Sequence, residues 1–170
     1  EDYYRYYGNY GAFENCTSLK SIEIPKSVTD IGSSVFSGCS SLQCILVDSQ
    51  NTYYTSADGV LFSRTGRNYL TLITYPAGRG AAYQIPADVR WIGAYAFSGC
   101  SGLTSVTIPE SVRSIGDSAF SGCYGLMSVT IPEGMASIGN STFSDCSSLT
   151  SVTIPEGVTS IGNSTFSDCS

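Results

Sequence analysis

The chain has 170 residues, of which 42% are hydrophobic, 13% are charged and none is histidine, and its formal net charge is −6. This composition supplies a core for one domain, but a net negative charge argues against nucleic-acid binding, which needs a basic surface. The lack of histidine excludes Ser-His-Asp and Cys-His catalysis, so the composition disfavours an enzyme and we expect neither a metal site nor a cofactor.

Five tyrosines precede the first repeat: Tyr3, Tyr4, Tyr6, Tyr7 and Tyr10. From Phe13 onward the pattern F-x-x-C-x-x-L-x-x-[VI]-x-I-P-x-x-[VM]-x-x-I-G-x-x-x-F returns with a step of 23 residues. Its copies begin at Phe13, Phe36, Phe97, Phe120, Phe143 and Phe166. We expect the tyrosines to cap the first coil, as its cover or as the remnant of a preceding coil; ligand contact is the alternative.

One repeat is too small to fold alone. In TSVTIPE, Val152 and Ile154 alternate with hydroxyl side chains, which predicts a short strand that Pro155 ends. Gly162 then allows a bend, and no stretch between such breakers is long enough for a full helix. The repeats must therefore stack, and the sequence predicts a single solenoid domain over residues 1–170, with parallel strands and little helix. Because the last repeat breaks off at Ser170 and the chain lacks an initial Met, we expect a fragment of a longer protein.

The repetition fails between Phe36 and Phe97, a step of 61 residues. The extra residues fall within about 48–83, where Val60-Leu61-Phe62 and Tyr69 to Tyr75 predict a hairpin around the turn at residues 64–67. This region is also more basic than its surroundings. Residues 48–90 hold Arg64, Arg67, Arg79 and Arg90 against three aspartates, whereas residues 91–170 hold Arg113 alone against six acids.

Two aromatic residues follow the insertion in columns that elsewhere hold Ser or Asp: Trp91 and Tyr95. Exposed aromatic side chains beside arginine are typical anchors of protein interfaces, so Trp91, Tyr95, Arg64, Arg67 and Arg90 are candidate binding residues. The alternative is that both aromatics simply pack beneath the insertion.

The outward strand columns of the C-terminal half form a uniform hydroxyl surface of Ser105, Ser128, Ser151, Thr107, Thr130 and Thr153. In the N-terminal half the second of these columns becomes Glu23, Leu46 and Gln84, which we add to the candidate binding residues. Identical coils present one surface repeatedly, so the irregular half is better suited to specific recognition.

Six of the seven cysteines share one repeat column, and stacked strands lie too far apart for disulfides between neighbours. We expect these six to be buried and Cys44, on the outward strand face, to be an accessible thiol. Glu110, Glu133 and Glu156 stack at one edge, which predicts a solvated acidic edge in preference to glycosidase carboxylates or a cation site. Asn15, Asn140 and Asn163 stand in N-x-[ST] sequons.

These combined columns, L-x-x-I-x-I-P-x-x-V-x-x-I-G-x-x-x-F-x-x-C, resemble the BspA-like class of leucine-rich repeats from about Phe13 to Ser170. The resemblance implies a right-handed leucine-rich-repeat coil with parallel strands on the concave face and turns or short extended segments on the convex face. It also implies a cell-surface or extracellular protein of host-associated bacteria or protists, with adherence to matrix proteins among the family's functions.

We therefore expect a cell-surface or secreted binding module whose partner is a protein or glycan of host or neighbouring cells. The first alternative is a structural spacer within a longer surface rod, with recognition elsewhere. An enzyme is the remaining alternative. No apolar run approaches the roughly 18 residues that cross a bilayer, so we expect no membrane insertion within this sequence.

Overall fold

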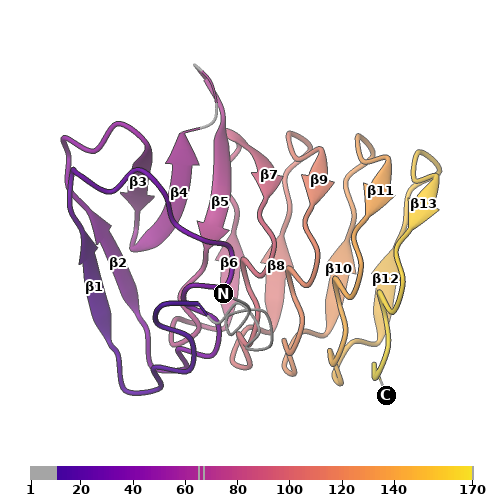
Figure 1. Ribbon diagram of the computed structural model, residues 1–170. Coiled ribbons are helices and arrows are strands. Elements are labelled where there is room, and N and C mark those ends of the chain that lie inside the picture. The colour runs from indigo at the N-terminus through magenta and orange to yellow at the C-terminus, as the bar shows by residue number, and fades with distance from the viewer. Residues whose placement is uncertain (1–10, 65, 67, 170) are drawn as a thin grey trace, which may run out of the picture.

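The computed structural model describes residues 11–64, 66 and 68–169, and the regular structure of these residues consists of strands without helix (Figure 1). The strands are β1 (Ser21–Ile24), β2 (Cys44–Val47), β3 (Tyr54–Ala57), β4 (Val60–Arg64), β5 (Leu70–Thr74), β6 (Ala82–Gln84), β7 (Val89–Ile92), β8 (Ser105–Thr107), β9 (Ser114–Ile115), β10 (Ser128–Thr130), β11 (Ser137–Ile138), β12 (Ser151–Thr153) and β13 (Ser160–Ile161). The predicted parallel solenoid with little helix is confirmed.

The predicted strands form parallel ladders along one side of the molecule. β1 pairs with β2, and β6, β8, β10 and β12 form a separate four-stranded sheet. Residues one repeat apart face each other, as Ser128 does Ser151. Within β10 the valine Val129 is 3% exposed, whereas Ser128 and Thr130 are exposed, because successive side chains of a strand point to opposite faces. We call the exposed serine and threonine columns of β8, β10 and β12 the hydroxyl sheet.

A second sheet runs along the opposite side of each coil (Figure 1). Its strands β7, β9, β11 and β13 are parallel, and three of them contain only the Ser-Ile pair that precedes a repeat glycine. The predicted short extended segments are therefore regular enough to form a ladder. Ile115 and Ile138 are paired across this ladder, and both are buried, with exposed fractions of 3% and 2%.

The core lies between the two sheets, since inward side chains of both sheets belong to one cluster. Its centre is a stack of phenylalanine rings. Phe97 and Phe120 have centroids 4.6 Å apart, and Phe120 and Phe143 have centroids 5.2 Å apart, with the planes nearly parallel. A smaller cluster around Phe36, Leu42 and Ile45 fills the N-terminal coils. The insertion therefore divides the apolar interior into two clusters.

The irregular step between Phe36 and Phe97 contains a coil in which Tyr75 replaces the ladder phenylalanine. The Tyr75 ring stacks on Phe97 with a centroid distance of 5.2 Å. The Cys100 thiol donates to the Tyr75 carbonyl oxygen at 3.6 Å, just as the Cys123 thiol donates to that of Phe97 at 3.1 Å. The insertion therefore belongs to the part of the chain between Phe36 and Tyr75.

The predicted hairpin is confirmed, as β4 and β5 are antiparallel, and a further strand precedes it. β3 pairs antiparallel with β4 through a turn at Asp58-Gly59. Both turn residues have positive φ, 50° for Asp58 and 74° for Gly59, as a two-residue hairpin turn of type I′ requires. The irregular region thus extends the second sheet by β5, which is parallel to β7, and by β4 and β3, each antiparallel to the strand beside it.

Candidate binding surface

The β4–β5 hairpin ends in a polar pocket of about 280 Å³. Its lining combines a cation, an amide, an aromatic ring, an aliphatic side chain and an acid: Arg64, Asn68, Tyr69, Leu70 and Asp88, with Gly66 at the turn. The backbone N–H of Leu70 donates to the carbonyl oxygen of Asp88 at 3.0 Å, which joins the hairpin to the start of β7. The pocket is therefore formed by the insertion together with a regular coil.

An aromatic and arginine cluster surrounds this pocket. The Arg90 guanidinium carbon lies 4.9 Å from the ring centroid of Tyr69, a cation–π contact that holds the ring at the surface with 45% of its area exposed. The backbone N–H of Arg64 donates to the carbonyl oxygen of Tyr53 at 2.8 Å, and Tyr53 is 52% exposed. We call Tyr53, Arg64, Tyr69 and Arg90 the hairpin patch.

Trp91 and Tyr95 continue from the hairpin patch along the second sheet. Trp91 is half-buried in β7, paired with Thr71 of β5 on one side and with Ser114 of β9 on the other. Tyr95 follows β7 with φ of 60° and is 40% exposed. It shares this left-handed position with Ser118, whose φ is 55°, so the predicted column is correct. Both aromatics therefore lie beside the insertion without being fully covered by it.

The other candidate residues lie elsewhere. Glu23 of β1 pairs with Leu46 of β2, and both are exposed, Leu46 to 51%. Gln84 is exposed in β6, opposite Thr107. These three belong to the ladders opposite the second sheet, and those ladders are interrupted between β2 and β6. The structure thus brings together Arg64, Arg90 and Trp91, with Tyr95 close by in the chain, and separates them from Glu23, Leu46 and Gln84. Arg67 lies outside the described residues.

Sequence reasoning missed Tyr53 and Tyr69 as surface residues, as well as two exposed side chains in the uniform half. Tyr124 is 54% exposed and Met127 is 53% exposed. Both depart from columns that are otherwise polar in the neighbouring coils, namely Ser101 and Ser147 for Tyr124, and Thr104 and Thr150 for Met127. The same departure that singled out Trp91 would have found them.

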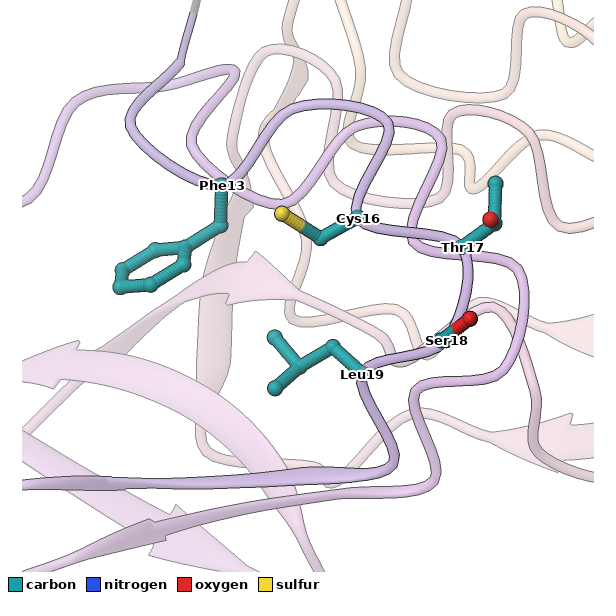
Figure 2. A pocket seen from close by; sticks show the side chains of 5 residues that line it. All are labelled: Phe13, Cys16, Thr17, Ser18 and Leu19. Atoms are coloured by element: carbon teal, nitrogen blue, oxygen red, sulfur yellow. The ribbon is translucent and has the colours of Figure 1, made fainter.

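A larger hollow at the first coil has a different origin. It has a volume of about 480 Å³ and is lined by Phe13, Cys16, Thr17, Ser18 and Leu19. Figure 2 shows Phe13, Cys16 and Leu19 directed toward one space, away from Thr17 and Ser18. The same three columns one coil later, Phe36, Cys39 and Leu42, are buried. The hollow is therefore the stacking face of a coil rather than a built ligand site. The predicted tyrosine cap concerns residues 1–10, which lie outside the described residues.

The thiol prediction needs a correction. Cys39, Cys100, Cys123 and Cys146 are buried as expected, but Cys16 of the same column is exposed, because it lies on this stacking face, and Cys169 in the last repeat is only half-buried. Cys44 is half-buried rather than freely accessible. A Cβ added to Gly59 would lie 3.0 Å from the Cys44 sulfur, so the β3–β4 turn approaches the thiol closely. The physical reason is the insertion, whose Asp58-Gly59 turn lies along the edge of β2, where the backbone N–H of Ile45 donates to the Gly59 carbonyl oxygen at 2.9 Å.

The raised pKa values of the buried cysteine thiols do not favour nucleophilic chemistry. Burial raises the pKa of the Cys146 thiol to about 12 and raises the pKa values of the Cys100 and Cys123 thiols as well. A nucleophilic thiolate requires the opposite shift. Among the described residues, no three side chains of Cys, Asp or Glu are grouped as a metal site would require. The described residues also include no helix that could span a membrane.

The sequon asparagine Asn140 takes part in a side-chain ladder. Its backbone N–H donates to Asp117 Oδ1 at 2.8 Å, and its side-chain amide lies 3.3 Å from Asp117 Oδ2. Its own Oδ1 accepts from the Asn163 N–H at 2.9 Å. The Asn140 side chain therefore connects three coils.

The sequence and the fold were compared with known protein families and solved structures, and both comparisons identify leucine-rich repeats. Residues 6–72 and 81–170 match the model of the BspA type leucine rich repeat region, in six copies. Among curated proteins, none matches the chain. Among solved structures, a leucine-rich repeat protein from Eubacterium ventriosum is similar with a TM-score of 0.81 and 34% identity, covering 89% of this chain and 40% of that one.

Two further solved structures are similar over most of the chain. A leucine-rich cell surface protein from Faecalibacterium prausnitzii has a TM-score of 0.70 and 35% identity, covering 89% of this chain and 46% of its own. The pneumococcal vaccine antigen PcpA has a TM-score of 0.78 and 29% identity, covering 85% of this chain and 35% of its own. The chain thus spans less than half the length of each of these three proteins. With its 23-residue coils, its stacked phenylalanines and these matches, the chain belongs to the BspA-type leucine-rich repeat family.

Proposed function

We propose that this chain is a binding module of a cell-surface or extracellular protein and that it binds a macromolecule of host or neighbouring cells, such as an extracellular-matrix protein. Support for a surface role comes from its similarity to a leucine-rich cell surface protein and to a vaccine antigen. The observation that carries the proposal is the insertion beside β7. It gathers Arg64, Tyr69, Arg90 and Trp91 on one side of an otherwise uniform solenoid.

Recognition would centre on the hairpin patch with Trp91 and Tyr95. Aromatic and arginine side chains dominate the binding energy of protein interfaces, because they bury large surfaces and form directional contacts. The hydroxyl sheet, in contrast, repeats Ser and Thr from coil to coil and gives a partner no unique register. Glu23, Leu46 and Gln84, on the ladders opposite the second sheet, would form a separate, secondary contact.

The test compares variants for binding to immobilised matrix proteins and to host-cell surfaces. Truncating a central interface tryptophan costs about 2 kcal/mol, or about thirtyfold in affinity, so Trp91→Ala should weaken binding to that extent. The double variant Thr130→Ala/Thr153→Ala removes hydroxyls from the hydroxyl sheet and should leave binding within about twofold. Circular dichroism must first show that each variant is folded. Loss of binding only in the threonine variant would contradict the proposal.

A structural spacer is the second candidate. The stretches 128–147 and 151–170 are identical at eighteen of twenty positions, and β8, β10 and β12 continue one sheet without interruption. Such repetition is sufficient to extend a rod and carries no partner-specific surface. Failure of every variant and of the parent chain to bind either matrix proteins or cells would favour this candidate.

A further inference from the structure

The pocket at the β4–β5 hairpin contains a cation without an acidic partner. Within the described residues, the one ion pair joins Arg79 and Asp58, whose side chains meet at 2.7 Å. Arg90 stacks on Tyr69, so its guanidinium face is occupied. Arg64 is exposed, lines the pocket, and makes no ion pair with a described carboxylate. Among the described residues that line the pocket, it is therefore the guanidinium available to a ligand.

From these contacts we infer that the pocket binds an Asp or Glu side chain of an acidic protein segment; this deepens, and rests on, the proposed function. A guanidinium presents its donors as a planar fork that matches a carboxylate with two parallel hydrogen bonds. The Asn68 amide is a second donor in the same lining. The positive charge of Arg64 stands out from the rest of the chain, which carries a net charge of −6 and has an acidic C-terminal half.

Asp88 narrows the ligand class. Asp88 lines the same pocket and is exposed. A sulfated glycan or a nucleic acid carries its anionic groups in dense succession, so a fixed carboxylate repels several of them at once, whereas it repels an isolated peptide carboxylate only once. The Asp88 carboxylate also accepts hydrogen bonds, and a peptide supplies donors from its backbone N–H groups beside the acidic side chain. Arg64 and Asp88 together therefore match a peptide better than a sulfated glycan or a nucleic acid.

The size and the apolar wall of the pocket agree with one side chain and its neighbouring backbone. A volume of about 280 Å³ falls just below that of pockets that enclose drug-sized ligands, about 300–1,000 Å³. Tyr69 and Leu70 supply the apolar wall, and Trp91 follows Arg90 in β7. An acidic residue followed by an apolar one would place its carboxylate on Arg64 and its apolar neighbour toward this wall.

The test uses fluorescence anisotropy with the full chain and three probes: a labelled peptide of alternating Glu and Tyr, its Gln-for-Glu counterpart, and a labelled heparin fragment. The Glu peptide should bind at least about tenfold more tightly than the Gln peptide, and the affinity should fall as salt is raised. Arg64→Glu should weaken binding of the Glu peptide at least about tenfold, and Arg64→Lys should weaken it less, because lysine keeps the charge and loses the fork.

Lys20→Glu is the matched control, because it makes the same change in charge at an exposed position in the loop before β1. It should leave the affinity for the Glu peptide within about twofold. Equal binding of the Glu and Gln peptides, an equal loss in Lys20→Glu, or Arg64-dependent binding of heparin alone would each overturn the inference. If the acidic peptide fails to bind while Trp91→Ala still weakens binding to matrix proteins or cells, the inference fails and the proposed function stands.

Discussion

Each buried cysteine of the ladder serves as a hydrogen-bond donor within the stack. The thiols of Cys39, Cys123 and Cys146 donate to the carbonyl oxygens of Phe13, Phe97 and Phe120, at 2.9, 3.1 and 3.2 Å. In every case the acceptor belongs to the aromatic residue that opens the preceding coil. Because a thiol must keep its proton to donate, this role agrees with the raised pKa values of the Cys123 and Cys146 thiols.

Removal of one such thiol should destabilise the fold. We expect Cys123→Ala to lower the free energy of unfolding by about 1–2 kcal/mol, because it removes a hydrogen bond and leaves a small cavity in a fully buried site. Cys16→Ala, at an exposed position of the same column, should change it by less than about 0.5 kcal/mol. Urea denaturation of the two variants measures the difference; equal effects would show that the ladder thiols contribute nothing specific.

Two tyrosines in ring contact, Tyr75 and Tyr83, predict a loss of stability at high pH. Burial raises the pKa of Tyr83 to about 12, above its ordinary value of 10, and the pKa of Tyr75 is raised for the same reason. The folded state thus favours the protonated phenols, so this contribution is complete below pH 10 and is lost as the pH rises through about 12. In an absorbance titration of the phenolates, Tyr83→Phe should remove a late-titrating group and make the alkaline loss of stability less steep. A titration curve that Tyr83→Phe leaves unchanged would contradict this.

At the scale of elements, the β3–β4 turn fixes the insertion on the solenoid. The Ile45 N–H donates to the Gly59 carbonyl oxygen at 2.9 Å, and Arg79 pairs with Asp58 from the loop after β5. The turn is therefore attached both to β2 and to the loop that leads into β6. This attachment positions β4, which carries Arg64 at its end.

Gly59→Ala tests this attachment against a matched glycine. Both Gly59 and Gly66 have positive φ, 74° and 80°, so an added Cβ strains either backbone. At Gly59 the Cβ would also lie 3.0 Å from Cys44 Sγ and from an Arg79 nitrogen, whereas nothing lies within 4 Å at Gly66. We expect Gly59→Ala to cost about 2–3 kcal/mol and Gly66→Ala about 1 kcal/mol in thermal unfolding. A larger loss at Gly66 would show that the turn is not the attachment point.

Much of the fold could be predicted because the same pattern of residues returns every 23 positions. Columns of Val, Ile and Pro predicted the ladder that pairs Ser128 with Ser151, and the apolar runs on either side of residues 64–67 predicted the β4–β5 hairpin. β3 was missed, because YTSA has no apolar alternation and becomes a strand only by pairing with β4. The Asp58-Gly59 pair was the available signal, since this dipeptide favours the tight hairpin turn that the structure contains.

The candidate site could be predicted only in part. Departures from the repeat columns identified Trp91 and Tyr95, and charge identified Arg64 and Arg90. The contact between Arg90 and Tyr69 depends on an irregular register, in which Leu70 pairs with Val89 but Thr71 pairs with Trp91. Arg90 is thus left out of the pairing between β5 and β7, and the 23-residue period does not predict this irregularity. The separation of Glu23 and Leu46 from Trp91 likewise depends on which sheet each strand joins.

At the scale of the whole molecule, each coil is stabilised by its neighbours, whereas the features suited to specific recognition are concentrated at the insertion. Ile131 and Ile138 are each 2% exposed, but their counterparts in the last coil, Ile154 and Ile161, are 39% and 50% exposed. A coil's apolar side chains are thus covered by the next coil, as in other repeat proteins. The insertion interrupts this regular stacking and supplies the only three-stranded antiparallel segment of the described residues.

The central claim, that recognition centres on the hairpin side of the solenoid, is tested most directly by hydroxyl-radical footprinting of the chain with and without a bound matrix protein. Reactive side chains lie on both parts of the surface, Tyr69, Trp91 and Tyr95 near the insertion, and Tyr124 and Met127 on the uniform coils. We predict that the partner protects Tyr69, Trp91 and Tyr95 and leaves oxidation of Tyr124 and Met127 unchanged. Protection of Tyr124 and Met127, with Tyr69 and Trp91 as reactive as in the free chain, would contradict it.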